Sequence, residues 1–431
     1  MPKASVHASE LSGVRWSAPI IDKFTFVPFL ACAYATIVAP LILITFSSTL
    51  EEAFASHPEH KVFWPAVTAI SFILVARNSS RLTLPPHIVC LFAYLAFAGA
   101  SVLWAINPQL SFIRYAQQVM VVTSIVLPLM LVGRTADMMR SLFLCFAFAA
   151  VLNLFFISGN PPFSGYFTGK NYLGEFAGVA LLLALHEALY SGFRRVLGII
   201  MVFIAIALLL LSDSKTSLGL AILAPLLAGF TLIIGRITGL SPAIILLSIP
   251  IGYEVLSHVI PGFNVYRLSY MLYGDSTFTG RAMIWDFADY QISRRPLHGW
   301  GYQSFWLAGP DSPSVLDARG WIKGMPNAHS GYIDTKLEMG YIGLALLVTF
   351  IATTLHAIKR VADRDPVRAW GVLSLALFVI IYNFLESTWM RAFEFLWVVF
   401  LIISADLCRY WRPFGLGGRS QQGRRFSPNP R

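Results

Sequence analysis

The stretch SLGLAILAPLLAGFTLIIG (residues 217–235) decides the fold class, because it contains no charged side chain. A helix of about 20 apolar residues is long enough to cross a bilayer. Similar runs recur along nearly the whole chain of 431 residues, which is 56% hydrophobic and only 13% charged. Soluble domains carry about 25% charged residues. The composition therefore argues strongly against a soluble fold.

We expect about twelve membrane-spanning segments. They centre near residues 24–46, 60–76, 87–104, 113–132, 140–158, 173–191, 196–211, 217–235, 242–260, 331–357, 370–387 and 392–408. All should be helices, because an open sheet would leave backbone groups unpaired in lipid. The first segment lacks the short apolar core and small-residue cleavage site of a signal peptide, so we take it as a permanent anchor. The predicted fold class is an all-α, polytopic integral membrane protein.

The distribution of charge predicts the orientation, because cytoplasmic loops are enriched in Lys and Arg. Most of the 32 Lys and Arg residues fall on one side when the N-terminus is placed inside. The predicted order is a cytoplasmic tail (1–23), helices 1–9 (24–260), a large periplasmic loop (261–330), helices 10–12 (331–408) and a basic cytoplasmic tail (409–431). The net charge of +10 follows from this topology. We therefore expect membrane lipids, but no nucleic acid, as partners.

A few cations break this charge rule, because they lie in short outer connections. They are Arg114, Lys170, Lys215 and Arg391, together with Lys61. A cation at each of several outer helix ends could converge on one anion. The alternative is that these long side chains only reach towards the membrane surface. We favour the anion site, because the large loop carries further cations.

Among those loop cations, Arg281 and the pair Arg294 and Arg295 have forked guanidinium groups that suit two-point contact with phosphate. Lys170 and Lys215 would add point charges. A diphosphate leaving group needs such contacts, because charge develops on it as it departs. The alternative for Arg294 and Arg295 is ordinary solvated loop charge.

The best candidate for a general base is His329, which is followed by Ser330 at the entry of a helix. Histidine titrates near neutral pH, where general bases work best. Its alternatives are an orienting or a purely structural role. Glu386 is an acid near the outer end of a span, and we expect it to pair with Arg391 or Lys215.

Several aromatic and glycine residues complete the candidate set. Trp285, like other tryptophans of the loop, could stack on sugar rings or could anchor the loop at the membrane surface. The two glycines Gly340 and Gly343 lie three residues apart, so we expect them on one helix face, a spacing that allows close helix packing. Pro296, Gly299 and Gly301 should bend the loop sharply.

The sequence suggests neither a metal nor a cofactor. Among the acids of the predicted outer side there is no DxD pair, and we find no cluster of His, Cys and Asp with metal-ligand spacing and no nucleotide-binding motif. We expect a metal-independent mechanism without cofactors. There is also no convincing two-fold internal repeat of the kind that many transporters have.

The pattern His329-Ser330, nine residues, Gly340, two residues, Gly343 resembles the motif of bacterial O-antigen ligases and Wzy-type polysaccharide polymerases. The large periplasmic loop of the same superfamily is resembled by two further patterns. They are Gly280-Arg281-x3-Trp285 at the start of the loop and the turn Pro296-x-x-Gly299-x-Gly301. Four further segments are most similar to its ExoQ-like exopolysaccharide polymerase branch. They are Trp104–Arg114, Lys170-Asn171-x-x-Gly174, Ser214-Lys215-Thr216 and Glu386-Ser387.

This resemblance implies a GT-C-like membrane glycosyltransferase of the bacterial inner membrane. Such enzymes act at the periplasmic face on glycans linked to undecaprenyl diphosphate, with a lipid-linked donor and acceptor, and need no metal. A chain-length co-polymerase and a flippase are further partners to expect. Arg281 and Lys215 would bind the diphosphate, Lys170 and Arg114 are further candidates, and His329 would be catalytic or would orient the acceptor. Many relatives have arginine where this chain has Lys215. A lysine cannot make the two-point contact with phosphate that arginine makes at that position.

Three functions remain open at this point. The preferred one is polymerisation of lipid-linked repeat units into a secreted exopolysaccharide. The second is an O-antigen ligase that transfers the lipid-linked glycan to the lipid A core, and the His329 motif barely separates the two. The third is a transporter of lipid-linked glycans, which should carry charges at mid-membrane rather than at one face.

Overall fold

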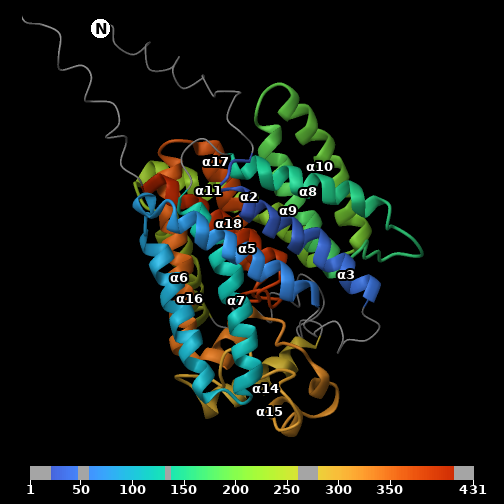
Figure 1. The fold of residues 1–431 in the computed structure, drawn as a ribbon, viewed down its shortest axis with the longest axis vertical. Coiled ribbons are helices and arrows are strands. Elements are labelled where there is room, and N and C mark those ends of the chain that lie inside the picture. Colours follow the sequence, from blue (N-terminus) through green and yellow to red (C-terminus); the bar gives the residue numbers. More distant parts are fainter. Residues whose placement is uncertain (1–20, 47–57, 132–136, 261–279, 412–431) are drawn as a thin grey trace, which may run out of the picture.

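A computed structural model describes residues 21–46, 58–131, 137–260 and 280–411. Within these ranges the chain forms helices and connecting turns, and no strand. The two predicted tails lie almost entirely outside the described residues, as does the first part of the large loop, 261–279. The all-α class is confirmed for the described part (Figure 1).

Each predicted span coincides with a helix or a run of helices. The bounds are α2 (Phe26–Ala33), η1 (Tyr34–Val38), α3 (Ala39–Phe46), α5 (Pro58–Ala76), α6 (Pro86–Ser101), α7 (Pro108–Leu129), α8 (Met138–Leu154), α9 (Lys170–Ala188), α10 (Phe193–Ser212), α11 (Lys215–Thr238), α12 (Pro242–Val259), α16 (Gly331–Ala362), α17 (Pro366–Tyr382) and α18 (Phe395–Asp406). Eight candidate spans among the described residues are long and apolar enough to cross a membrane. The chain is therefore a polytopic membrane protein, and the count of twelve spans stays a prediction.

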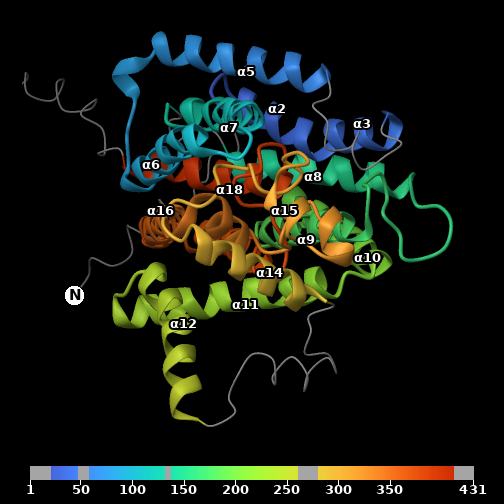
Figure 2. The same cartoon turned by 90° about the horizontal axis from the view of Figure 1, so that it is seen from below.

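The centre of the bundle is α18, in which every residue from Phe395 to Asp406 is buried. It packs against α7, α17 and α2, while α9 lies among α8, α10, α11 and α17. The helices α5 and α12 lie at opposite edges of the bundle when it is seen along its length (Figure 2). Only 22% of each of their apolar windows is buried. These two helices therefore present most of their surface to lipid.

Buried ion pairs fasten one end of the bundle. Arg194 at the start of α10 pairs with Glu187 at the end of α9 and lies 3.4 Å from Asp137 before α8. Arg368 on α17 joins Asp137 at 3.3 Å and Asp406 on α18 at 2.8 Å. Because these groups are mutually compensated, they can remain buried. The network fixes α8, α9, α10, α17 and α18 at the end remote from the start of α9.

The described part of the large loop, residues 280–330, is a folded cap rather than an open loop. It contains α14 (Arg281–Arg294), α15 (Pro313–Leu316) and the short turn η4 (Gly320–Gly324). The cap covers one end of the bundle (Figure 1). Its small core is made of Ile284, Ile292, Trp300, Phe305, Trp306 and Ala328, together with Leu337 of α16. Side chains in this cap are therefore held by packing.

The cap is anchored in a break of α16 at Gly340, which has φ +65° and ψ −167°. The freed amide of Tyr341 donates to Pro296 O at 2.8 Å. In return, the amide of Trp300 donates to Leu337 O at 3.0 Å. A Cβ atom on Gly340 would stand 2.2 Å from Leu297 O. Only glycine fits this conformation and this close approach.

This break corrects one expectation. Gly340 does not share a regular helix face with Gly343, because the helix is interrupted at Gly340 itself. The expected sharp bend of the loop is confirmed, since Gly299 and Gly301 have φ values of +66° and +95°. Gly299 approaches the backbone of Glu338 closely, which explains why the bend docks there.

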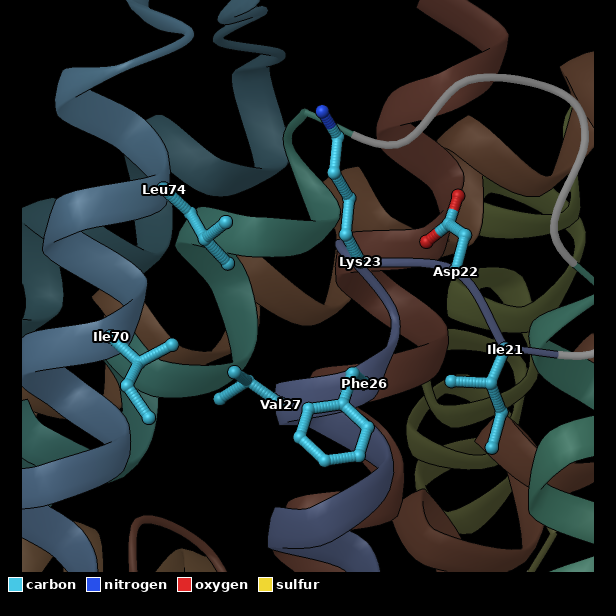
Figure 3. Close-up of a pocket in the computed structure, with 7 residues that line it drawn as sticks. All are labelled: Ile21, Asp22, Lys23, Phe26, Val27, Ile70 and Leu74. Atoms are coloured by element: carbon cyan, nitrogen blue, oxygen red, sulfur yellow. The ribbon is translucent and has the colours of Figure 1, made fainter.

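A separate apolar opening lies between α2 and α5. Figure 3 shows Ile70 and Leu74 of α5 across from Val27 and Phe26 of α2, with the ammonium group of Lys23 pointing away from them. None of the site residues predicted from the sequence lines this opening. The candidate site is therefore built elsewhere, at the capped end of the bundle.

Candidate active site

The candidate site is centred on the carboxylate of Glu386. Glu386 accepts hydrogen bonds from Arg281 Nη2 at 2.6 Å, from His329 Nδ1 at 3.0 Å and from Asn171 Nδ2 at 3.4 Å. The side chains of Glu386 and Arg281 are each 15% exposed, and that of His329 is 30% exposed. The group is thus sheltered but open to a substrate.

The partners of Glu386 come from three different helix beginnings. Asn171 is in the first turn of α9, Arg281 opens α14, and His329 stands two residues before α16. Among the described residues, no side chain caps the start of any of these three helices. The beginning of a helix carries partial positive charge and unpaired amide groups, which favour anions. The arrangement therefore adds backbone dipoles to the side-chain cations.

The start of α11 joins the same end of the bundle. A Cβ atom on Gly174 of α9 would stand 2.4 Å from Cβ of Ser214, the residue before α11. Lys170 and Lys215 are the first residues of the two helices that meet here. Lys170 Nζ lies 3.5 Å from Asp213 Oδ2 in an exposed pair. Lys215 is exposed, and in the described part of the chain it makes no ion pair.

The backbone around His329 is held by several contacts. His329 itself has φ +48°, a conformation that non-glycine residues seldom adopt. The indole of Trp285 donates to Ala328 O at 3.0 Å, and the amide of Ala328 donates to Asp334 Oδ1 at 3.0 Å. The unusual conformation thus follows a residue that is held through both its carbonyl and its amide, and such conformations are common at functional sites.

The same segment is tied directly to Glu386. Ser330 Oγ is 3.5 Å from Asn383 O, and the amide of Gly331 donates to Glu386 O at 3.0 Å and to Asn383 O at 2.9 Å. Ser330 therefore supports the site as its helix-entry residue. The backbone and the side chain of Glu386 both contact the His329 segment, so the two segments are tied to each other.

This contact assigns the tautomer of His329. An ionised carboxylate can only accept hydrogen bonds, so Nδ1 of His329 carries the proton that faces Glu386. In the neutral imidazole, the other ring nitrogen, Nε2, then has a free lone pair. An imidazole oriented in this way by a carboxylate is the arrangement of a general base.

Two predicted cations are placed behind the site rather than in it. Arg391 Nη2 lies 2.9 Å from Glu338 Oε1 and 3.3 Å from Asp334 Oδ2. Arg114 Nη1 donates to Gln303 O at 2.5 Å. The Arg391 guanidinium is thus paired with two carboxylates of the protein, and that of Arg114 donates to a backbone carbonyl. Asp334 in turn holds the amide of Ala328, so Arg391 supports the His329 segment from behind.

The expectation that Glu386 pairs with Arg391 or Lys215 was wrong. Its partners are Arg281 and His329, because the cap folds back over the end of the bundle and brings α14 to it. Arg295 is also directed elsewhere: its guanidinium lies 4.2 Å from the ring centroid of Trp300, and its Nη1 contacts Trp104 O at 3.5 Å.

Burial fixes one further hydroxyl near Arg114. Tyr302 donates from its hydroxyl to Met390 O at 2.6 Å, and burial raises the pKa of this phenol well above its ordinary value. The phenol therefore stays protonated and remains a donor. It links the cap to the segment after α17 that carries Glu386.

Two residues were missed as candidates from the sequence. Asn171 was part of a quoted motif, and its position directly after Lys170 at a helix start was the available signal. Asp334 holds Ala328, Trp306 and Arg391 together, and its position in the first turn of α16 was the signal for an anchoring role. The described residues contain no group of three or more His, Cys, Asp or Glu side chains suited to a metal ion. The metal-independent mechanism stays a prediction.

Comparison with known proteins gives one informative relative. No protein-family model matches the chain. The "Exopolysaccharide production protein ExoQ" of Rhizobium meliloti (strain 1021) is 27% identical to it over 306 residues. The match covers 64% of this chain and 67% of the relative. The resemblance to ExoQ-like proteins that the motifs indicated is thereby confirmed.

Proposed function

Starting from this similarity to a protein of exopolysaccharide production, we propose that the chain is a Wzy-type polymerase. It joins oligosaccharide repeat units that are linked to undecaprenyl diphosphate into a secreted exopolysaccharide. The reaction takes place at the periplasmic face of the inner membrane, with both chain termini in the cytoplasm. One observation carries the proposal: the Glu386 carboxylate contacts both Arg281 and His329. Arg281 has the forked guanidinium group that suits phosphate, and His329 is oriented as a general base.

The proposed reaction is a single displacement. A hydroxyl oxygen of the acceptor sugar attacks the anomeric carbon of the donor glycan and forms the new glycosidic bond. The bond from that carbon to the diphosphate oxygen breaks, and the diphosphate leaves with the electron pair. Nε2 of His329 takes the hydroxyl proton. General-base assistance of this kind contributes about 10²- to 10⁴-fold to a rate.

The departing diphosphate needs positive charge around it. Arg281 contacts Glu386 through Nη2 alone, so its other N–H groups can contact phosphate oxygens. Lys170 and Lys215 add point charges at the starts of α9 and α11. The uncapped helix starts add oriented amide groups, which stabilise developing charge without reorganisation.

Glu386 acts as a positioning residue in this scheme. It selects the Nδ1-protonated tautomer of His329 and stabilises the imidazolium that forms after proton transfer. By also holding Arg281, it sets the distance between the base and the diphosphate. The proposed partners are the lipid-linked donor and acceptor, with a flippase and a chain-length co-polymerase acting before and beside the polymerase.

The test is a deletion strain of the host that is complemented with the wild-type gene, with His329→Ala or with His298→Ala. The control, His298, is another histidine of the cap, is exposed, and does not contact Glu386. We expect high-mass exopolysaccharide with the wild type and with His298→Ala, but only lipid-linked single repeats with His329→Ala at equal protein level. Lipopolysaccharide should be intact throughout.

Other outcomes assign the protein differently. Loss of O-antigen from a complete lipid A core, with polymer still made on its carrier, identifies a ligase. Accumulation of lipid-linked repeats on the cytoplasmic side identifies a transporter. Normal polymer length with His329→Ala removes His329 from the mechanism.

A further inference from the structure

One tryptophan of the cap differs from the others. Trp285, Trp300 and Trp306 each donate their indole N–H within the protein, to Ala328 O, Gln291 O and Asp334 Oδ1. Trp300 and Trp306 are 6% and 3% exposed, whereas Trp321 on the turn η4 is 50% exposed. Within the described part of the chain, the indole of Trp321 makes no hydrogen bond.

The position of this exposed ring is close to the candidate site. Atoms Cζ2 and Cη2 of Trp321 would lie 3.7 and 3.9 Å from a Cβ atom on Gly280. The ring therefore packs over Gly280, the residue that directly precedes Arg281 at the start of α14. Arg281 in turn contacts Glu386. The indole therefore packs against the residue that precedes Arg281 in the sequence, and Arg281 is the cation that we assign to the diphosphate.

The chemistry of an exposed indole suits a sugar. One face of a pyranose ring presents C–H groups, and its edges present hydroxyl groups. A tryptophan offers a large apolar ring surface at a low cost in conformational entropy, together with one polar N–H group. Arg319 and Lys323, two residues before and after Trp321, are exposed cations, so polar groups are available close to the ring in sequence.

We propose that Trp321 is a stacking platform for a sugar ring of the lipid-linked glycan, placed beside the diphosphate that Arg281 holds. This inference rests on the proposed polymerase function and adds to it the subsite that recognises the sugar. Trp321 would contact a sugar ring of the glycan, while the cations would contact the diphosphate. The alternative role of an exposed tryptophan, anchoring at the membrane surface, predicts no dependence on the glycan.

The test separates the sugar contact from the diphosphate contact with two inhibitors. Purified protein polymerises lipid-linked oligosaccharide that has been extracted from membranes of the deletion strain. The first inhibitor is the same oligosaccharide released from its lipid, and the second is undecaprenyl diphosphate without sugar. The variant Trp321→Leu keeps apolar bulk but removes the aromatic face. Tyr290→Leu is the matched control, because Tyr290 is 61% exposed on α14 and is likewise an aromatic residue of the cap.

We expect Trp321→Leu to weaken inhibition by the free oligosaccharide about tenfold, which corresponds to about 1.4 kcal/mol. Inhibition by undecaprenyl diphosphate should be unchanged. Trp321→Phe should restore most of the loss, and Tyr290→Leu should behave as the wild type. Arg281→Ala should show the reverse pattern, with weaker inhibition by the lipid diphosphate.

Equal inhibition by the oligosaccharide in wild type and Trp321→Leu overturns the inference. An equal loss towards both inhibitors also overturns it, because it shows general damage to the cap. If wild-type protein makes no polymer from the extracted oligosaccharide, the proposed function fails first. The two failures are therefore distinguishable in one set of measurements.

Discussion

Replacing Glu386 by glutamine removes one negative charge and leaves the shape of the side chain nearly unchanged. The substitution weakens two contacts, at 3.0 Å to His329 and at 2.6 Å to Arg281. A hydrogen bond to a charged group contributes about 1.5–3 kcal/mol. In the proposed reaction, the contact to His329 gains charge in the transition state, when the imidazolium forms. Since about 1.4 kcal/mol corresponds to a tenfold change in rate, kcat should fall about 10- to 150-fold.

A double-mutant cycle shows whether Glu386 acts through His329. The rates of Glu386→Gln, His329→Ala and the double variant are measured with purified protein and extracted lipid-linked oligosaccharide. Residues that act as one unit are strongly non-additive. We therefore expect the double variant to be about as slow as His329→Ala alone. Thermal unfolding of each variant in detergent checks that the fold is retained.

Two results refute this reasoning. If the two losses multiply in the double variant, Glu386 acts independently of His329. If Glu386→Gln retains the wild-type kcat, the carboxylate neither selects the tautomer nor stabilises the imidazolium. A rise in KM alone would place its role on the side of Arg281.

Further substitutions test the remaining contacts. Arg281→Lys keeps the charge but loses the fork, so the KM for the lipid-linked donor should rise about tenfold in steady-state kinetics, and an unchanged KM would argue against two-point phosphate contact. Arg391→Leu leaves Asp334 and Glu338 buried without their cation, and it should lower the free energy of unfolding by about 3–5 kcal/mol, measured by denaturation in detergent. Gly340→Ala places a side chain on a backbone conformation that only glycine adopts readily, and its Cβ would stand 2.2 Å from Leu297 O. It should destabilise the protein by about 3 kcal/mol or more. A stable variant in the same assay would show that the break in α16 can relax.

The membrane helices were predictable from the sequence because hydropathy is a local property. Every apolar run that was long enough coincides with a helix, with ends displaced by a few residues. The cap was harder to predict, since α14 has neither strong apolar periodicity nor a capping side chain at its start. Its helical form depends on packing among residues far apart in the sequence, such as Ile284 and Leu337.

The composition of the site was predictable, but the pairing within it was not. His329 and Arg281 were candidates by residue type and motif, and the structure brings both to Glu386. The pairing partner of Glu386 was assigned wrongly to Arg391 or Lys215, whereas the observed partner Arg281 is 105 residues away in the sequence. Choosing between these partners requires knowing that the cap folds over the bundle. Such a long-range arrangement leaves no periodic signal in the sequence.

The break at Gly340 has a mechanical consequence. In an unbroken helix, each residue added would rotate everything beyond it by about 100°. In α16, the segment that carries His329 at its entry is instead held by hydrogen bonds from Trp300 to Leu337 and from Gly301 to Glu338. The angular setting of His329 is thus decoupled from the helical phase of the membrane-embedded half of α16. Substitutions at lipid-facing positions beyond the break should therefore leave the orientation of His329 unchanged.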